Sequence, residues 1–105
     1  MVDPNKRLET LLKMTASPSA DSFAWYALAL EYRKAGRLDE SLSTFDRLAE
    51  RDASYLPMYL MAGQTAIEAS KRDVAKSWLE RGITLAEAKG DMKALGELQS
   101  ELAGL

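Results

Sequence analysis

Cysteine and histidine are both absent from this 105-residue chain. Without cysteine there is no disulfide bond and no thiolate ligand for a metal. Without histidine the chain lacks the side chain that proteins use most often as a general base near neutral pH and as a ligand for transition metals. The two absences count against histidine-dependent catalysis and against a transition-metal site, and we expect neither a metal nor a cofactor.

An excess of charge of either sign is also missing. The chain has 14 lysines and arginines against 16 aspartates and glutamates, which gives a formal net charge of −2. A protein that neutralises nucleic-acid phosphates normally has a clear excess of basic side chains. We therefore expect no nucleic-acid partner.

Long apolar runs do not occur either. The longest, Phe23 to Leu30, is far shorter than the roughly 20 residues that a membrane-spanning helix needs. The N-terminal sequence MVDPNKRLE has charges where a signal peptide would have its apolar region. We expect no membrane association and, by default, a cytoplasmic location.

The composition that remains is typical of a soluble globular domain, with 47% hydrophobic and 29% charged residues. Apolar or small side chains recur every three or four residues on both sides of Ala35-Gly36-Arg37, and this spacing predicts two amphipathic helices. A connection this short folds the two helices into an antiparallel hairpin. The positions are Trp25, Leu28, Ala29 and Tyr32 before the turn and Leu38, Leu42, Phe45 and Leu48 after it.

Similar stripes and capping residues divide the whole chain into six expected helices, at about 4–14, 22–34, 38–51, 57–70, 73–89 and 91–103. Aspartate and serine favour helix N-caps, so we expect such caps at Asp3, at Asp21 or Ser22, and at Asp73, with Asp91 opening the last helix. Gly36 and Gly90 are expected in the left-handed conformation that commonly ends a helix.

A displacement of 34 residues superimposes the hairpin on the sequence that follows it. It places Trp25 on Tyr59, Leu28 on Ala62, Ala29 on Gly63, Ser41 on Ala75 and Phe45 on Leu79. The small residues in this list are expected where two helices come closest, because a larger side chain would separate them. A helix-turn-helix unit of this length and pattern resembles the tetratricopeptide repeat.

The resemblance implies an all-α fold, a right-handed α-solenoid of antiparallel helix hairpins with about six helices. It divides the single domain, 1–105, into a first repeat at 22–55 and a second at 56–89. Gly82 stands where the family usually has alanine. The segment 4–14 is then a cap helix or half repeat, and 91–103 is a C-terminal capping helix. We expect Leu95, Leu98 and Leu102 to pack this last helix, and Lys93, Glu97 and Glu101 to lie outside.

No group of residues has the spacing of a catalytic site. Asp39-Glu40 begins a helix, where the helix dipole favours negative charge, and no phosphate-binding glycine pattern occurs. We expect no enzyme. In the family's superhelix the first helix of each hairpin lines a concave groove, and the resemblance implies that a hydrophobic or amphipathic protein or peptide segment binds there. The groove residues are Phe23, Tyr26, Ala27, Leu30, Arg33 and Lys34 in the first repeat and Leu60, Met61, Gln64, Ile67 and Glu68 in the second.

Two alternatives remain open for this apolar face. In the first, the N-terminal or the C-terminal helix covers part of the face, and Tyr26, Leu30 and Leu60 belong to the core rather than contacting a ligand. The face would instead form a homodimer if it serves self-association. The resemblance also argues against one known ligand class, because the lysine and asparagines that family members use to hold the acidic tails of chaperones are absent at Tyr26, Leu30 and Met61.

Overall fold

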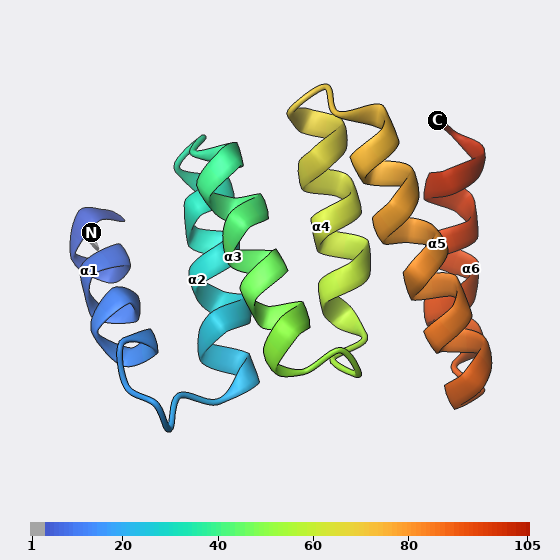
Figure 1. The fold of residues 1–105 in the computed structure, drawn as a ribbon. Helices are drawn as coiled ribbons and strands as arrows, with labels where there is room; N and C mark the ends of the chain where they lie inside the picture. The colour runs from blue at the N-terminus through green and yellow to red at the C-terminus, as the bar shows by residue number, and fades with distance from the viewer. Residues whose placement is uncertain (1–3) are drawn as a thin grey trace. The chain divides into compact units, whose positions relative to one another are not determined.

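The computed structural model describes residues 4–105, so the cap predicted at Asp3 lies outside the described residues. This part of the chain contains six α-helices and no strand, as predicted. The helices are α1 (Pro4–Thr15), α2 (Ser22–Lys34), α3 (Leu38–Arg51), α4 (Pro57–Glu68), α5 (Arg72–Lys89) and α6 (Met92–Ala103) (Figure 1). They form two compact units that divide after Asp52. No helix within residues 4–105 is both long enough and apolar enough to cross a bilayer.

The first unit is built on the hairpin of α2 and α3. Ala29 and Ser41, predicted to lie at a close approach, are fully buried, and the Ser41 hydroxyl donates a hydrogen bond to the Ala29 carbonyl over 2.7 Å. Phe45 and Leu48 of α3 are also fully buried. The small side chains bring the two helix backbones together, and the apolar stripe supplies the core.

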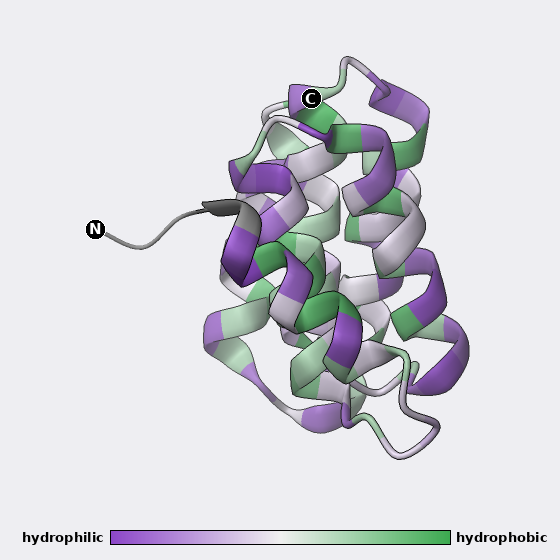
Figure 2. Cartoon of the chain, turned by 90° about the vertical axis from the view of Figure 1, so that its left-hand side faces the viewer, coloured by the Kyte–Doolittle hydropathy of each residue, from purple (hydrophilic) through white to green (hydrophobic). Residues whose placement is uncertain are grey.

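Helix α1 adds a second layer to this unit. Leu8 and Leu11 pack with Leu28 and Tyr32 of α2 in one core cluster, and Arg7 forms an ion pair with Glu31 at 3.6 Å. In Figure 2, hydrophobic and hydrophilic residues alternate within the turns of α1, the helix that follows the grey residues. The amphipathic N-terminal helix predicted from the sequence is therefore present and packed.

The turns of the first unit follow the capping prediction. The Asp21 carboxylate accepts a hydrogen bond from the Ala24 N–H at 2.8 Å, so Asp21 rather than Ser22 is the N-cap of α2. Gly36 has φ 78°, the left-handed conformation predicted for it. These local signals explain why both predicted boundaries of α2 and α3 agree with the structure.

The second unit contains the hairpin of α4 and α5 together with α6. A Cβ atom placed on Gly82 would lie 2.6 Å from Tyr59 Cβ and 2.9 Å from a methyl carbon of Leu98. The glycine thus allows both α4 and α6 to approach α5, which explains why alanine is missing at this position. Next to it the rings of Tyr59 and Trp78 lie 5.7 Å apart, and Arg81 stacks on both.

Two boundaries in the second unit differ from the prediction. Helix α4 ends at Glu68, and Ser70 has φ 59° in the turn where the first hairpin has Gly36. Helix α5 begins at Arg72 with Lys71 as its N-cap residue, so Asp73 lies in the first turn and does not cap the helix as predicted. The expectations for Gly90 and Asp91 are confirmed: Gly90 has φ 69°, and the Asp91 carboxylate accepts from the Ala94 N–H at 3.0 Å.

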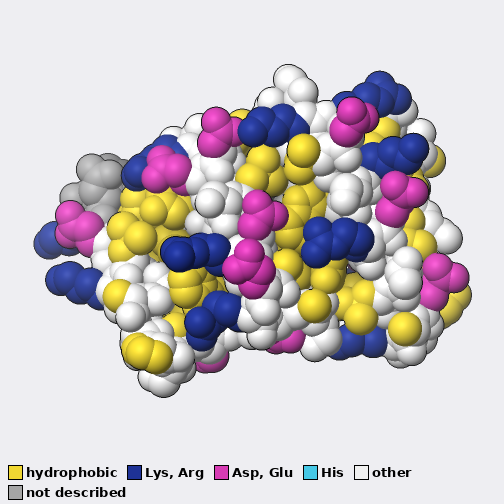
Figure 3. All heavy atoms as spheres, viewed as in Figure 1, with side chains coloured by type: hydrophobic (Ala, Val, Ile, Leu, Met, Phe, Trp, Pro, Cys, Tyr) yellow, Lys and Arg dark blue, Asp and Glu magenta, His cyan; other side chains and the backbone are white. Residues whose placement is uncertain are grey.

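The surface reflects the balanced charge of the sequence. On the face shown in Figure 3, basic and acidic side chains are interspersed with apolar ones. Selective binding at such a surface depends on the local combination of side chains in a cleft.

Candidate functional site

The predicted face of α2 is partly open in the first unit. Phe23 is 65% exposed and Lys34 is exposed, whereas Leu30 and Arg33 are half-buried. Tyr26 is half-buried and its ring meets Phe45 edge-on, with 6.5 Å between the ring centroids. The α2 face therefore combines one exposed aromatic side chain with partly covered ones.

Ala27 is half-buried and packs against the core cluster that α1 forms with α2. Helix α1 therefore covers part of the predicted face on this side of α2. Tyr26 and Leu30 are half-buried as well, so their assignment to a binding face stays a prediction.

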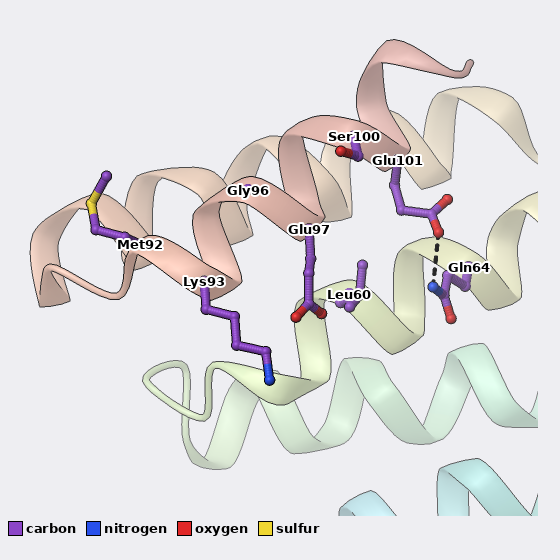
Figure 4. A pocket seen from close by; sticks show the side chains of 8 residues that line it. All are labelled: Leu60, Gln64, Met92, Lys93, Gly96, Glu97, Ser100 and Glu101. Carbon is purple, nitrogen blue, oxygen red and sulfur yellow. Dashed lines mark hydrogen bonds between the residues drawn. The ribbon is translucent and has the colours of Figure 1, made fainter.

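A cleft of the second unit lies between α4 and α6. It has a volume of about 780 Å³ and is lined by Leu60, Gln64, Met92, Lys93, Gly96, Glu97, Ser100 and Glu101 (Figure 4). Leu60 and Gln64 were predicted from the sequence. Met61, Ile67 and Glu68 do not line this cleft: Met61 is half-buried, and the other two are exposed.

A hydrogen bond closes one end of the α4–α6 cleft. The Gln64 side-chain amide donates to a carboxylate oxygen of Glu101 over 2.8 Å. Lys93 and Glu97 extend from α6 toward α4 along the rest of the cleft (Figure 4). A Cβ placed on Gly96 would meet nothing within 4 Å, so there is open space above this residue.

Lys93 and Glu97 are exposed, as predicted, whereas Glu101 is half-buried, and all three line the cleft. On the opposite side of α6, Leu98 is buried and Leu95 and Leu102 are half-buried, in agreement with the expected packing. The aspartate N-caps of α2 and α6 align the two helices. Superimposing Asp91 on Asp21 places the apolar residues of α6 on those of α2, namely Leu95 on Trp25, Leu98 on Leu28 and Leu102 on Tyr32.

These surfaces offer apolar side chains, an amide, carboxylates and the cations of Lys34 and Lys93. Residues 4–105 contain no group of three or more acidic side chains arranged to hold a metal ion. Elsewhere, on the turn before α3, Arg37 donates two hydrogen bonds of 2.6 Å to Glu40, and these bonds raise the pKa of the Arg37 guanidinium above its usual value.

Comparison with known proteins identifies the family to which the chain is similar and solved structures with a similar fold. Residues 24–55 match the tetratricopeptide repeat family. A crystal structure of a tetratricopeptide repeat domain protein from Salinibacter ruber is 32% identical to this chain, covers 79% of this chain and 93% of its own, and has a TM-score of 0.72. A solution structure of a tetratricopeptide repeat domain protein from the same organism is also 32% identical, with coverages of 84% and 88% and a TM-score of 0.76.

A more distant structure shows the fold alone. The solution structure of a protein from Bordetella parapertussis is 24% identical, covers 91% of this chain and 84% of its own, and has a TM-score of 0.79. No curated protein matched the sequence. Together with the six observed helices, these structures confirm the predicted helical-repeat solenoid class.

Proposed function

The chain belongs to the tetratricopeptide repeat family, whose domains are generally protein-interaction modules, and on that premise we propose that it is a non-catalytic module that binds a short hydrophobic or amphipathic segment of a partner protein. The observation that carries the proposal is the α4–α6 cleft, which joins apolar and charged side chains in one volume of about 780 Å³. Ligand sites in proteins commonly have volumes of about 300–1,000 Å³.

The length of the cleft sets the size of the segment. From Met92 to Ser100 the cleft follows α6 for about 12 Å, at about 1.5 Å per residue. An extended chain advances about 3.3 Å per residue, so roughly four residues of partner fit. Above Gly96 no side chain intervenes, and the partner backbone can approach α6 closely there.

The chemistry of the lining sets the composition of the segment. Leu60 and the 72% exposed Met92 offer apolar contact, and the flexible thioether of methionine adapts to different shapes. Lys93 and Glu97 offer one charge of each sign. We therefore propose an apolar segment flanked by charged residues, with an affinity near 1 μM, which corresponds to about −8.2 kcal/mol.

The exposed face of α2 is proposed as the contact surface of the first unit. It consists of Phe23, Tyr26, Leu30, Arg33 and Lys34. Met61, Ile67 and Glu68, which lie on α4 outside the cleft, are proposed to extend the surface of the second unit.

Selection from a displayed library of random peptides tests the proposal. Peptides enriched on the wild-type protein are re-tested on the double variant Phe23→Glu and Leu60→Glu. Both residues are at least partly exposed, so the variant keeps its helices, which circular dichroism checks. We expect binding to weaken at least tenfold, because glutamate replaces the proposed apolar contact in each unit.

Val74→Glu is the matched control. Val74 is an exposed apolar residue of α5, 41% exposed, and it lies outside the α4–α6 cleft and the α2 face. We expect this variant to bind like the wild type. Unchanged binding by the double variant, or equal loss in the control, contradicts the proposed surfaces.

Self-association is the competing use of the same apolar side chains. Sedimentation over a hundredfold range of protein concentration separates the two functions. A concentration-independent monomer rules out the homodimer, whereas a dimer that dissociates in the double variant would replace peptide binding as the assignment. The cytoplasmic location stays a prediction.

A further inference from the structure

A second cleft lies in the first unit between α1 and α3. It opens because α1 packs on α2, while within residues 4–105 the backbones of α1 and α3 stay more than 8 Å apart between Cα atoms. Its volume is about 370 Å³. The buried side chains of Trp25, Leu28 and Tyr32 form its floor, while Leu12 of α1 and Arg47 of α3 lie on opposite rims.

The rims differ in charge. The α1 side consists of Leu12, Thr15 and Ala16, which are uncharged. The α3 side has Glu40 and Arg47, but Arg37 holds Glu40 through two hydrogen bonds of 2.6 Å. In the part of the chain that the structure describes, no carboxylate pairs with Arg47. The uncompensated charge in this cleft is therefore positive.

Arg47 is also held in place. Its guanidinium carbon lies 5.7 Å from the centre of the Trp25 ring, and that of Arg51 lies 5.2 Å from the same ring. A guanidinium over an indole face is attracted by the ring electrons and remains able to donate hydrogen bonds from its edge. In Figure 3, cationic side chains lie over apolar atoms on the face of α1 and α3. The cleft thus combines an apolar floor with a positioned cation.

We propose that the α1–α3 cleft binds an acidic segment of a partner protein, with one bulky apolar side chain on the Trp25 floor and a carboxylate paired with Arg47. A planar guanidinium pairs with carboxylates through two parallel hydrogen bonds. The apolar floor binds a bulky apolar side chain next to that carboxylate. The cleft therefore prefers a segment with both acidic and apolar residues to a segment with acidic residues alone. This site is separate from the α2 face and the α4–α6 cleft, so it is a second docking surface.

NMR titration with the capped tetrapeptide Glu-Phe-Leu-Glu tests the proposal. The chain has two tryptophans. The Trp25 indole N–H has no hydrogen-bond partner among residues 4–105, so its signal reports changes at the floor. We expect a saturable shift of the Trp25 signal while the Trp78 signal stays in place. Arg47→Gln is expected to raise the dissociation constant at least fivefold.

Arg81→Gln provides the control because Arg81 is the residue 34 positions after Arg47 and also stacks on aromatic rings, those of Tyr59 and Trp78. Each variant removes one positive charge and one guanidinium from an aromatic face. Binding by Arg81→Gln should equal that of the wild type. Equal weakening by both variants would show a general charge effect and would overturn the site.

Other ligands and a folding control complete the test. The peptide Lys-Phe-Leu-Lys is expected not to bind, and equal binding by it overturns the charge assignment. Phenylpropionate binding as tightly as the tetrapeptide overturns the assignment to a polypeptide. If Arg47→Gln fails to fold, Leu12→Glu carries the test, because Leu12 is 42% exposed on the uncharged rim. This variant should lose binding, and wild-type binding by it contradicts the proposal.

Discussion

Replacement of Gly82 by alanine is expected to destabilise the second unit through a single misplaced atom. The new Cβ would lie 2.6 Å from Tyr59 Cβ and 2.9 Å from a methyl carbon of Leu98. Tyr59 Cβ is bonded directly to the α4 backbone, so no side-chain rotation removes the clash and α4 must move. Overpacking of this kind costs about 1–3 kcal/mol.

Gly63→Ala provides the comparison within the same unit. Its Cβ would lie 2.6 Å from a methyl carbon and 2.8 Å from Cγ of Leu79, and both atoms move with rotation of the Leu79 side chain about its Cα–Cβ bond. Both variants gain about 1 kcal/mol because alanine favours a helix over glycine. We place the cost of overpacking near 3 kcal/mol for Gly82→Ala and near 1 kcal/mol for Gly63→Ala, so about 2 and about 0 kcal/mol of unfolding free energy are lost after the helix gain is subtracted.

The assay follows Trp78, which belongs to the second unit, in urea and thermal unfolding of proteins that all carry Trp25→Phe. A loss of 2 kcal/mol corresponds to a fall in midpoint temperature of about 10 °C for a domain of this size. An alanine at position 82 that is tolerated as well as one at position 63 would refute the close approach of α4, α5 and α6 around this glycine.

Three further variants test the local structure. Ser70→Gly should stabilise by about 0.5–1 kcal/mol in urea unfolding, because φ 59° strains a non-glycine residue; a destabilised variant would contradict this turn geometry. Ala29→Leu should cost about 1–3 kcal/mol by overpacking a fully buried position, and parental stability would show that the α2–α3 register is wrong. Asp91→Ala should cost about 1 kcal/mol through loss of the cap on Ala94, and amide exchange at the start of α6 should rise; unchanged exchange argues against the cap.

The sequence predicted the α2–α3 hairpin well because several local signals agree there. The apolar spacing, the Asp21 cap and Gly36 all specify the same boundaries. The α4–α5 turn lacks the glycine, and Ser70 adopts the left-handed conformation instead, so the end of α4 was placed two residues late.

The candidate site was predicted only in part. The resemblance to the repeat predicts Leu60 and Gln64, but it gives α6 only a capping role, so the residues of α6 that line the cleft were not predicted as binding residues. The α1–α3 cleft exists because α1 packs on α2 and not closely on α3. The spacing of side chains along single helices does not specify which pairs of helices pack together. The stacking of Arg47 and Arg51 on Trp25 likewise appears only once the hairpin is folded.

A partner segment is proposed to bind the α4–α6 cleft, and backbone amide NMR of the protein titrated with a library-selected peptide tests this binding. We predict saturable shifts for Leu60, Gln64, Gly96 and Glu101, with the largest effect at Gly96, where no side chain shields α6. Shifts confined to α3 and α5, with Gly96 unchanged at saturation, would contradict the proposed binding site.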